Sequence, residues 1–136
     1  MRVVIDTNCL IASIPPSSND FWLYLAFREL KFTWILSTEI LNEYEEKLSE
    51  FYSPKTADRV LKILLRSPNI ELINPAFRWN LIVDDEDDNK FADLAISANA
   101  HYLVSNDRHF NIFKNIDFPP LSVVKLNEFK EILDIY

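Results

Sequence analysis

The chain has 136 residues, of which 49% are hydrophobic and 26% are charged, which is typical of one folded domain and excludes wholesale disorder. The formal net charge of −7 argues against a simple basic nucleic-acid-binding module, and the lack of glycine excludes the P-loop and the dinucleotide-binding motif. The one cysteine cannot form an internal disulfide and the apolar runs are short, so we expect a cytoplasmic protein without a signal peptide or a membrane span.

Short β-branched runs alternate with helical patterns along the chain. In the first half, we predict strands at 2–5 and 32–36, a loop at 15–19, and helices at 21–30, 38–50 and 54–66. In the second half, we predict strands at 70–73, 102–104 and 121–124, a helix capped by the acidic run 84–88 and ending at Asn99, and a last helix capped by Asn127. This alternation predicts a single α/β domain over residues 1–136, with a mostly parallel sheet that binds ligands at the carboxyl ends of its strands.

Acidic residues occupy positions that such a sheet brings toward one edge. Asp6 follows the first strand and Asp107 the fourth, whereas Glu43 and Asp88 lie on helices that can lean over the same edge. Carboxylates crowded in one cleft repel one another, and a hard divalent cation relieves that repulsion. The pattern therefore predicts an Mg²⁺ or Mn²⁺ site able to act on a phosphodiester.

The segments that carry these acids resemble those of PIN-domain proteins. They are Val3–Asn8, Leu36–Tyr44, Asp87–Ala95 and Tyr102–Phe110. The resemblance extends from residue 2 to about residue 125, and it is strongest to a bacterial branch of toxins from toxin–antitoxin systems, related to VapC-type toxins.

This resemblance implies a three-layer PIN-like α/β fold, with a five-stranded parallel sheet in the order 3-2-1-4-5 and helices on both faces. It implies a metal-dependent endoribonuclease with an RNA substrate and a cognate antitoxin, and it leaves a homodimer open. The implied ligands of Mg²⁺ or Mn²⁺ are the acidic quartet Asp6, Glu43, Asp88 and Asp107. Asn8 and Ser105 match the polar residues that orient the first and last of these acids.

The chain departs from this family pattern at two places. Relatives carry glycine before the last acid, and this chain has Asn106, for which we expect a left-handed turn. Relatives carry Arg-Asp-Pro before the third acid, where this chain has Asp84-Asp85-Glu86. The identity of the third ligand therefore stays open, with Asp85, Asp87 and Asp93 as candidates beside Asp88.

Basic residues offer two candidate RNA contacts. A stripe at helical spacing is formed by Lys55, Arg59, Lys62 and Arg66, and it is typical either of a phosphate-tracking face or of a solvated helix. Lys90 and Arg108, together with Lys114, flank the acidic motifs. For His109 we favour a structural or surface role over that of a general base.

Two other functions are compatible with part of the pattern. A phosphoacceptor receiver domain needs an acidic pair after its first strand, whereas Asp6 stands alone there. A catalytically silent PIN-fold module that binds RNA or protein would retain the acids, and metal binding without cleavage would identify it.

Overall fold

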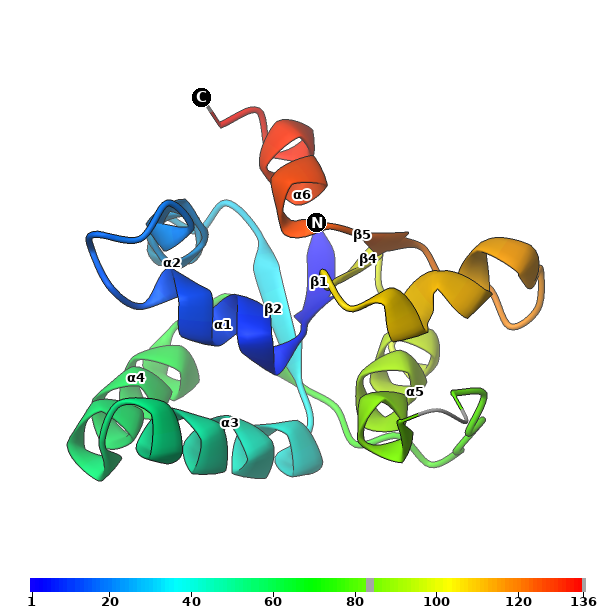
Figure 1. Ribbon diagram of the computed structural model, residues 1–136, viewed down its shortest axis with the longest axis horizontal. Coiled ribbons are helices and arrows are strands. Elements are labelled where there is room, and N and C mark those ends of the chain that lie inside the picture. The colour runs from blue at the N-terminus through cyan, green and yellow to red at the C-terminus, as the bar shows by residue number, and fades with distance from the viewer. Residues whose placement is uncertain (83–84, 136) are drawn as a thin grey trace.

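The computed structural model describes residues 1–82 and 85–135. It contains a five-stranded, entirely parallel sheet in the order β3-β2-β1-β4-β5, with helices on both faces (Figure 1). The strands are β1 (Arg2–Ile5), β2 (Thr33–Leu36), β3 (Ile70–Leu72), β4 (Tyr102–Val104) and β5 (Val123–Val124). The predicted fold class and strand order are confirmed, and the two edge strands are shorter than predicted.

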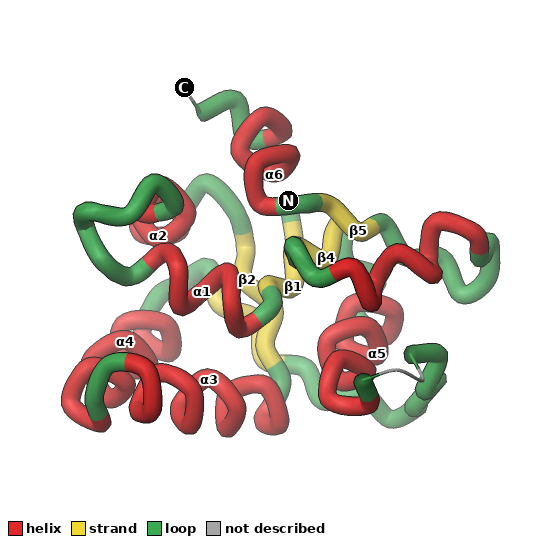
Figure 2. Tube along the Cα trace, viewed as in Figure 1, coloured by secondary structure: helices red, strands yellow, loops and turns green. Residues whose placement is uncertain are grey.

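Helices occupy most of the chain between these strands, so the short strands lie in the middle of the molecule (Figure 2). The α-helices are α1 (Thr7–Ser13), α2 (Phe21–Arg28), α3 (Thr38–Phe51), α4 (Pro54–Arg66), α5 (Asn89–Ser97) and α6 (Leu126–Ile132). Two 3₁₀ helices, η1 (Glu86–Asp88) and η2 (Arg108–Asn115), precede α5 and follow β4. None of the helices in the described part of the chain is both long enough and apolar enough to span a membrane.

Helices α3 and α4 begin where the sequence predicts, because each has a serine cap. The Ser37 hydroxyl accepts a hydrogen bond from the Ile40 N–H, and the Ser53 hydroxyl accepts one from the Thr56 N–H. Pro54 then occupies the first turn of α4, where its missing N–H costs nothing.

The last helix does not begin at the predicted cap. Lys125, and not Asn127, is the N-cap of α6. The Glu128 carboxylate accepts a hydrogen bond from the Lys125 N–H, and the Asn106 side chain accepts one from the Leu126 N–H. These two bonds satisfy N–H groups at the start of the helix, so the helix begins earlier than predicted.

Two helical segments were not predicted, α1 and η2. The apolar residues of α1 continue the hydrophobic run of β1, and a helix of seven residues shows little periodicity. Asp6 is the N-cap of α1, but its side chain makes no capping hydrogen bond. Asp107 is the N-cap of η2, and its side chain accepts a hydrogen bond from the His109 N–H. The helix therefore begins directly after this acid.

Because the chain has no glycine, other residues occupy its positive-φ positions. Asn80, Asn99 and Asp134 have positive φ, as expected of Asn and Asp, but so does the exposed Leu30. Asn106, for which we expected a left-handed turn, is not among the positive-φ residues of the described chain. Its side chain instead links the end of β4 to α6.

The hydrophobic core fixes α3 against the end of β1. Val3, Val4 and Ile5 are fully buried, as expected for a central strand of a parallel sheet. The Tyr44 hydroxyl on α3 donates a hydrogen bond to the Ile5 carbonyl, and it accepts one from the Trp34 indole N–H at 3.3 Å. The contact holds Glu43, the neighbour of Tyr44, near the residue that follows β1.

Candidate active site

The carboxyl ends of β1 and β4 place two of the predicted acids side by side. Ile5 pairs with Val104 in the parallel ladder, and the Asp6 N–H donates to the Val104 carbonyl at 3.0 Å. The Ser105 hydroxyl then donates to Asp6 Oδ2 at 2.7 Å and accepts from the Asp107 N–H at 3.0 Å. One buried hydroxyl therefore contacts both the Asp6 carboxylate and the backbone of Asp107.

Burial and crowding shift the pKa of Asp6 upward. Burial raises the pKa of Asp6 to about 6, against the lowering effect of the Ser105 hydrogen bond, and the charges of Asp88 and Asp107 raise it further. Burial also raises the pKa of Asp88, to which Asp107 and Asp85 add repulsion. These carboxylates are close enough to disfavour one another's ionised forms, so the site favours a cation.

A histidine lies between these acids. The His109 Nδ1 atom is 2.9 Å from Asp88 Oδ2, 3.2 Å from Asp107 Oδ1 and 3.9 Å from Asp85 Oδ2. The hydrogen bond with Asp88 is the main cause of a raised His109 pKa. From the sequence we favoured a structural or surface role for this residue, and its position two residues after Asp107 was the only sequence signal for a place in the site.

Glu43 reaches the site from α3, but both of its carboxylate oxygens already have partners. The Thr7 hydroxyl donates to Oε2, and the Lys90 ammonium lies 2.7 Å from Oε1. The side chains of Lys90 and Glu43 are only 11% and 16% exposed. Lys90, predicted as an RNA contact, is therefore largely buried and paired inside the site.

The structure gathers one group of ligand atoms more tightly than the predicted quartet. Among the residues it describes, the ligand atoms of Asp85, Asp88 and His109 all lie within 4.8 Å of one another. The sequence leaves Asp85 open as the third ligand, and the fold brings its carboxylate to the same group as Asp88.

Asp87 and Asp93, which the sequence also leaves open as the third ligand, are not part of this group in the described chain. Asp87 is exposed, and its Oδ1 atom lies 3.9 Å from Lys90 Nζ. Asp93 is buried, and its Oδ1 atom accepts a hydrogen bond from the Trp79 N–H at 3.0 Å. Asp84 lies outside the described residues.

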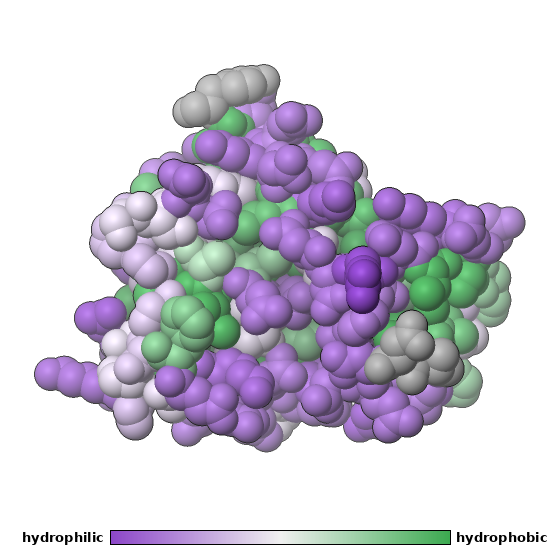
Figure 3. Space-filling model, viewed as in Figure 1, coloured by the Kyte–Doolittle hydropathy of each residue, from purple (hydrophilic) through white to green (hydrophobic). Residues whose placement is uncertain are grey.

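A shallow space borders the site on the α1 side. Asn8 is exposed there and shares a hollow of about 200 Å³ with Asp6 and Asp107. The hydrogen bond that orients Asp6 comes from Ser105 on the opposite side. Hydrophilic residues cover the middle of this face, where α1, α3, α5 and η2 meet (Figure 3).

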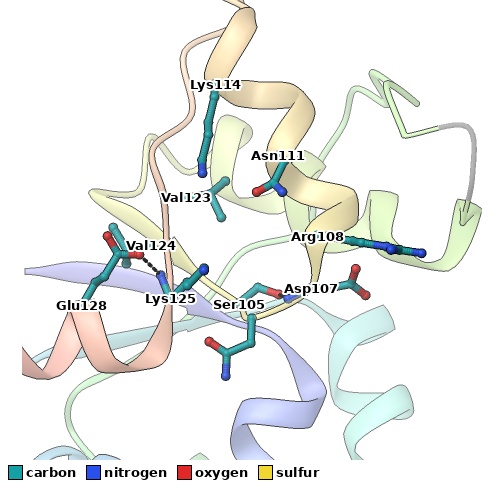
Figure 4. Close-up of a pocket in the computed structure, with 10 residues that line it drawn as sticks. Ser105, Asp107, Arg108, Asn111, Lys114, Val123, Val124, Lys125 and Glu128 are labelled. Carbon is teal, nitrogen blue, oxygen red and sulfur yellow. Dashed lines mark hydrogen bonds between the residues drawn. The ribbon is translucent and has the colours of Figure 1, made fainter.

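A second hollow, of about 110 Å³, lies behind the backbone of Asp107, between η2 and the start of α6. In Figure 4, Asn111 and Lys114 point from η2 into this hollow and Lys125 faces it, whereas Arg108 points away, to the side of the Asp107 carboxylate. The other predicted basic residues, on α4, are exposed and lie on the side of α3 away from α5 (Figure 1).

The site offers carboxylate oxygens and one imidazole nitrogen as donor atoms, and its carboxylates repel one another. Such a site fits a divalent cation. The fit depends on Asp6, Asp88 and Asp107, whose charges disfavour one another, and on Ser105, which holds the Asp6 carboxylate and the Asp107 backbone.

Comparison with known proteins identifies a family model and similar solved structures. A family model described as a PIN domain matches residues 2–109, from β1 to the histidine of the site. The chain is also similar to a chain in the crystal structure of VapBC2 from Rickettsia felis bound to a DNA fragment from their promoter, with a TM-score of 0.64. The two chains are 21% identical, and the likeness covers 92% of this chain and 98% of that one, which shows a shared fold. No curated protein matches the chain.

Proposed function

Because the chain belongs to the PIN domain family, we propose that it is a metal-dependent endoribonuclease and the toxin of a toxin–antitoxin pair. The observation that carries the proposal is the Ser105 hydroxyl, which donates to the Asp6 carboxylate and accepts from the backbone N–H of Asp107 at the carboxyl edge of the sheet. The Asp6 carboxylate makes no capping hydrogen bond to α1 and accepts one from Ser105.

Each residue of the site has a role in this proposal. Asp6, Asp88 and Asp107 would hold Mg²⁺ or Mn²⁺, and Ser105 would keep the first and last of them in place. When bound, such an ion activates water and neutralises charge on the phosphodiester. Lys90 pairs with Glu43 inside the site, on its α3 side, and fixes the position of that carboxylate.

The proposal is tested by incubating labelled RNA with the wild-type protein and with Asp6→Asn, each with and without Mn²⁺. Cleavage by the wild-type protein with Mn²⁺, and in no other combination, is the expected result. The competing function is a catalytically silent PIN-fold binding module. It is favoured by Glu43, whose two carboxylate oxygens are already paired with Thr7 and Lys90. Binding of Mn²⁺ without cleavage of any RNA would support that function instead.

We expect RNA phosphates to bind across the hollow of Figure 4. Changing Lys114 and Lys125 together to glutamine should weaken binding of single-stranded RNA and lower the slope of log affinity against log salt by about 1.4, or about 0.7 for each lost phosphate contact. The turnover number at saturating RNA should not change, since neither residue contacts the metal ligands. Fluorescence anisotropy over a salt series measures the affinities.

The matched control carries the same loss of charge on the exposed stripe of α4, with Lys55 and Lys62 changed to glutamine. If the control weakens RNA binding as much as the first variant, the contact is a general effect of charge and the hollow has no special role. If only the control weakens binding, RNA follows the α4 stripe, which is the other contact predicted from the sequence.

An enzyme that cuts cellular RNA needs a restraint, and we propose a small basic antitoxin as the partner. Its arginine or lysine would pair with the carboxylates around Asp88 and compete with the metal. Added Mn²⁺ and raised salt should both weaken the complex, measured by titration calorimetry. Binding that does not respond to Mn²⁺ would place the contact elsewhere, for example on α2, where Leu25 is exposed.

A further inference from the structure

The imidazole of His109 is held by the same segments that carry the acids. Its backbone N–H donates to Asp107 Oδ1 at 2.9 Å, which fixes the residue at the start of η2. The nearby Asp85 carboxylate is fixed as well, because its Oδ1 accepts from the Asp87 N–H at 3.1 Å. The Oδ2 atom of Asp85 is the one nearer to the ring, at 3.9 Å from Nδ1.

The spacing of these atoms is that of ligands around one ion. Ligand atoms at 2.0–2.1 Å from a metal are about 3.0 Å apart along the edge of an octahedron and about 3.4 Å apart in a tetrahedron. Nδ1 of His109 lies 2.9 Å from Asp88 Oδ2 and 3.2 Å from Asp107 Oδ1. These two distances lie close to the octahedral edge of about 3.0 Å, and Asp85 Oδ2, at 3.9 Å from Nδ1, is farther away.

We infer that His109 Nδ1 is a ligand of the divalent ion, together with Asp88 and Asp85 and next to Asp107. The inference rests on the proposed function, since it concerns the ion of the same site. It adds a nitrogen donor to a set that the sequence predicted to be all oxygen. Imidazole binds transition metals well and Mg²⁺ poorly, so the site selects ions such as Mn²⁺, Co²⁺ or Zn²⁺ over Mg²⁺.

The two histidines of the chain allow a matched experiment. His101 lies at the opposite end of β4, where its ring accepts a hydrogen bond from the Arg2 N–H at 3.0 Å. Co²⁺ is added to the full chain, and the NMR spectrum is searched for a ring N–H signal shifted by direct bonding to the metal. The wild-type protein and His101→Gln should show this signal, and His109→Gln should lack it.

Affinities for Mn²⁺ and Mg²⁺, measured by calorimetry without RNA, give the second readout. His109→Gln should lose roughly tenfold or more in Mn²⁺ affinity, at least what the loss of an outer-shell partner costs, with much less change for Mg²⁺. Absence of a shifted ring signal in the wild-type protein would overturn the inference. Tighter Mn²⁺ binding by His109→Gln would also overturn it, because His109 would then be a competing cation.

Failure of the inference and failure of the proposed function give different results. If the protein binds Mn²⁺ through His109 but cleaves no RNA, the assignment of His109 as a ligand holds and the proposed nuclease function is wrong. If the protein cleaves RNA with Mg²⁺ as well as with Mn²⁺ and shows no shifted histidine signal, the proposed nuclease function holds and the assignment of His109 as a ligand is wrong.

Discussion

Changing Asp6 to asparagine should abolish RNA cleavage, with a loss of at least about 1,000-fold. A bound divalent ion contributes several kcal/mol to charge stabilisation in the transition state, and about 1.4 kcal/mol corresponds to tenfold in rate. Asp6 is 5% exposed and its charge interacts with those of Asp88 and Asp107, so asparagine would leave the ion with one charged ligand fewer. Single-turnover cleavage of labelled RNA in Mn²⁺ measures the loss.

The same change should leave the metal-free protein equally stable or more stable. With a pKa of about 6 in the fold, against about 3.9 in a free chain, ionised Asp6 costs of the order of 2–3 kcal/mol above pH 6. Because the folded state holds this proton more tightly than the unfolded chain, the wild-type free energy of unfolding falls as the pH rises from about 4 to 6. Asparagine has no such cost, so its stability advantage should be largest above pH 6 and should vanish below about pH 4.

Asp58→Asn is the control for both measurements, since Asp58 is exposed on α4 and pairs with Lys62 at the surface. This variant should change neither RNA cleavage nor the pH dependence of the free energy of unfolding. A large drop in the melting temperature of metal-free Asp6→Asn would show that the carboxylate is structural and serves the turn between β1 and α1. Retained cleavage by the folded variant would remove Asp6 from the reaction.

The elements that the sequence predicts well are those whose signals are local. β1 is buried on both faces and is therefore an uninterrupted β-branched run, and α3 and α4 each carry a serine cap with its hydrogen bond. Local signals do not predict the strand order, because the alternation of strands and helices predicts a parallel sheet but not which strands are neighbours. Only the family resemblance supplied the order that puts Asp6 beside Ser105.

The contacts that the sequence does not predict join residues far apart in the chain. Lys90 meets Glu43 only because α3 and α5 approach each other, and Thr7 reaches the same acid from a helix that was not predicted. His109 reaches Asp88 because η2 turns back at Asp107. No spacing in the sequence encodes such approaches, so Lys90 was interpreted as an RNA contact and His109 as a structural or surface residue.

Removal of divalent ions should stop the reaction completely, and this effect should be reversible. EDTA strips the ion that relieves repulsion among Asp6, Asp88 and Asp107, and no other cation at the site can activate water. Lys90 is committed to Glu43, and His109 balances only part of the remaining charge. Cleavage measured in EDTA should be at background, and Mn²⁺ added in excess should restore it within the same sample.

The same titration should raise the melting temperature, because the ion binds the folded state and not the unfolded chain. At 100 times its dissociation constant, an ion adds about 2.7 kcal/mol to the free energy of unfolding, or roughly 10 °C for a domain of this size. Asp6→Asn, which has one ligand fewer, should show a much smaller rise. Full cleavage in EDTA would refute a metal-dependent mechanism, whereas a melting temperature that rises with Mn²⁺ equally in both proteins would place the ion away from Asp6.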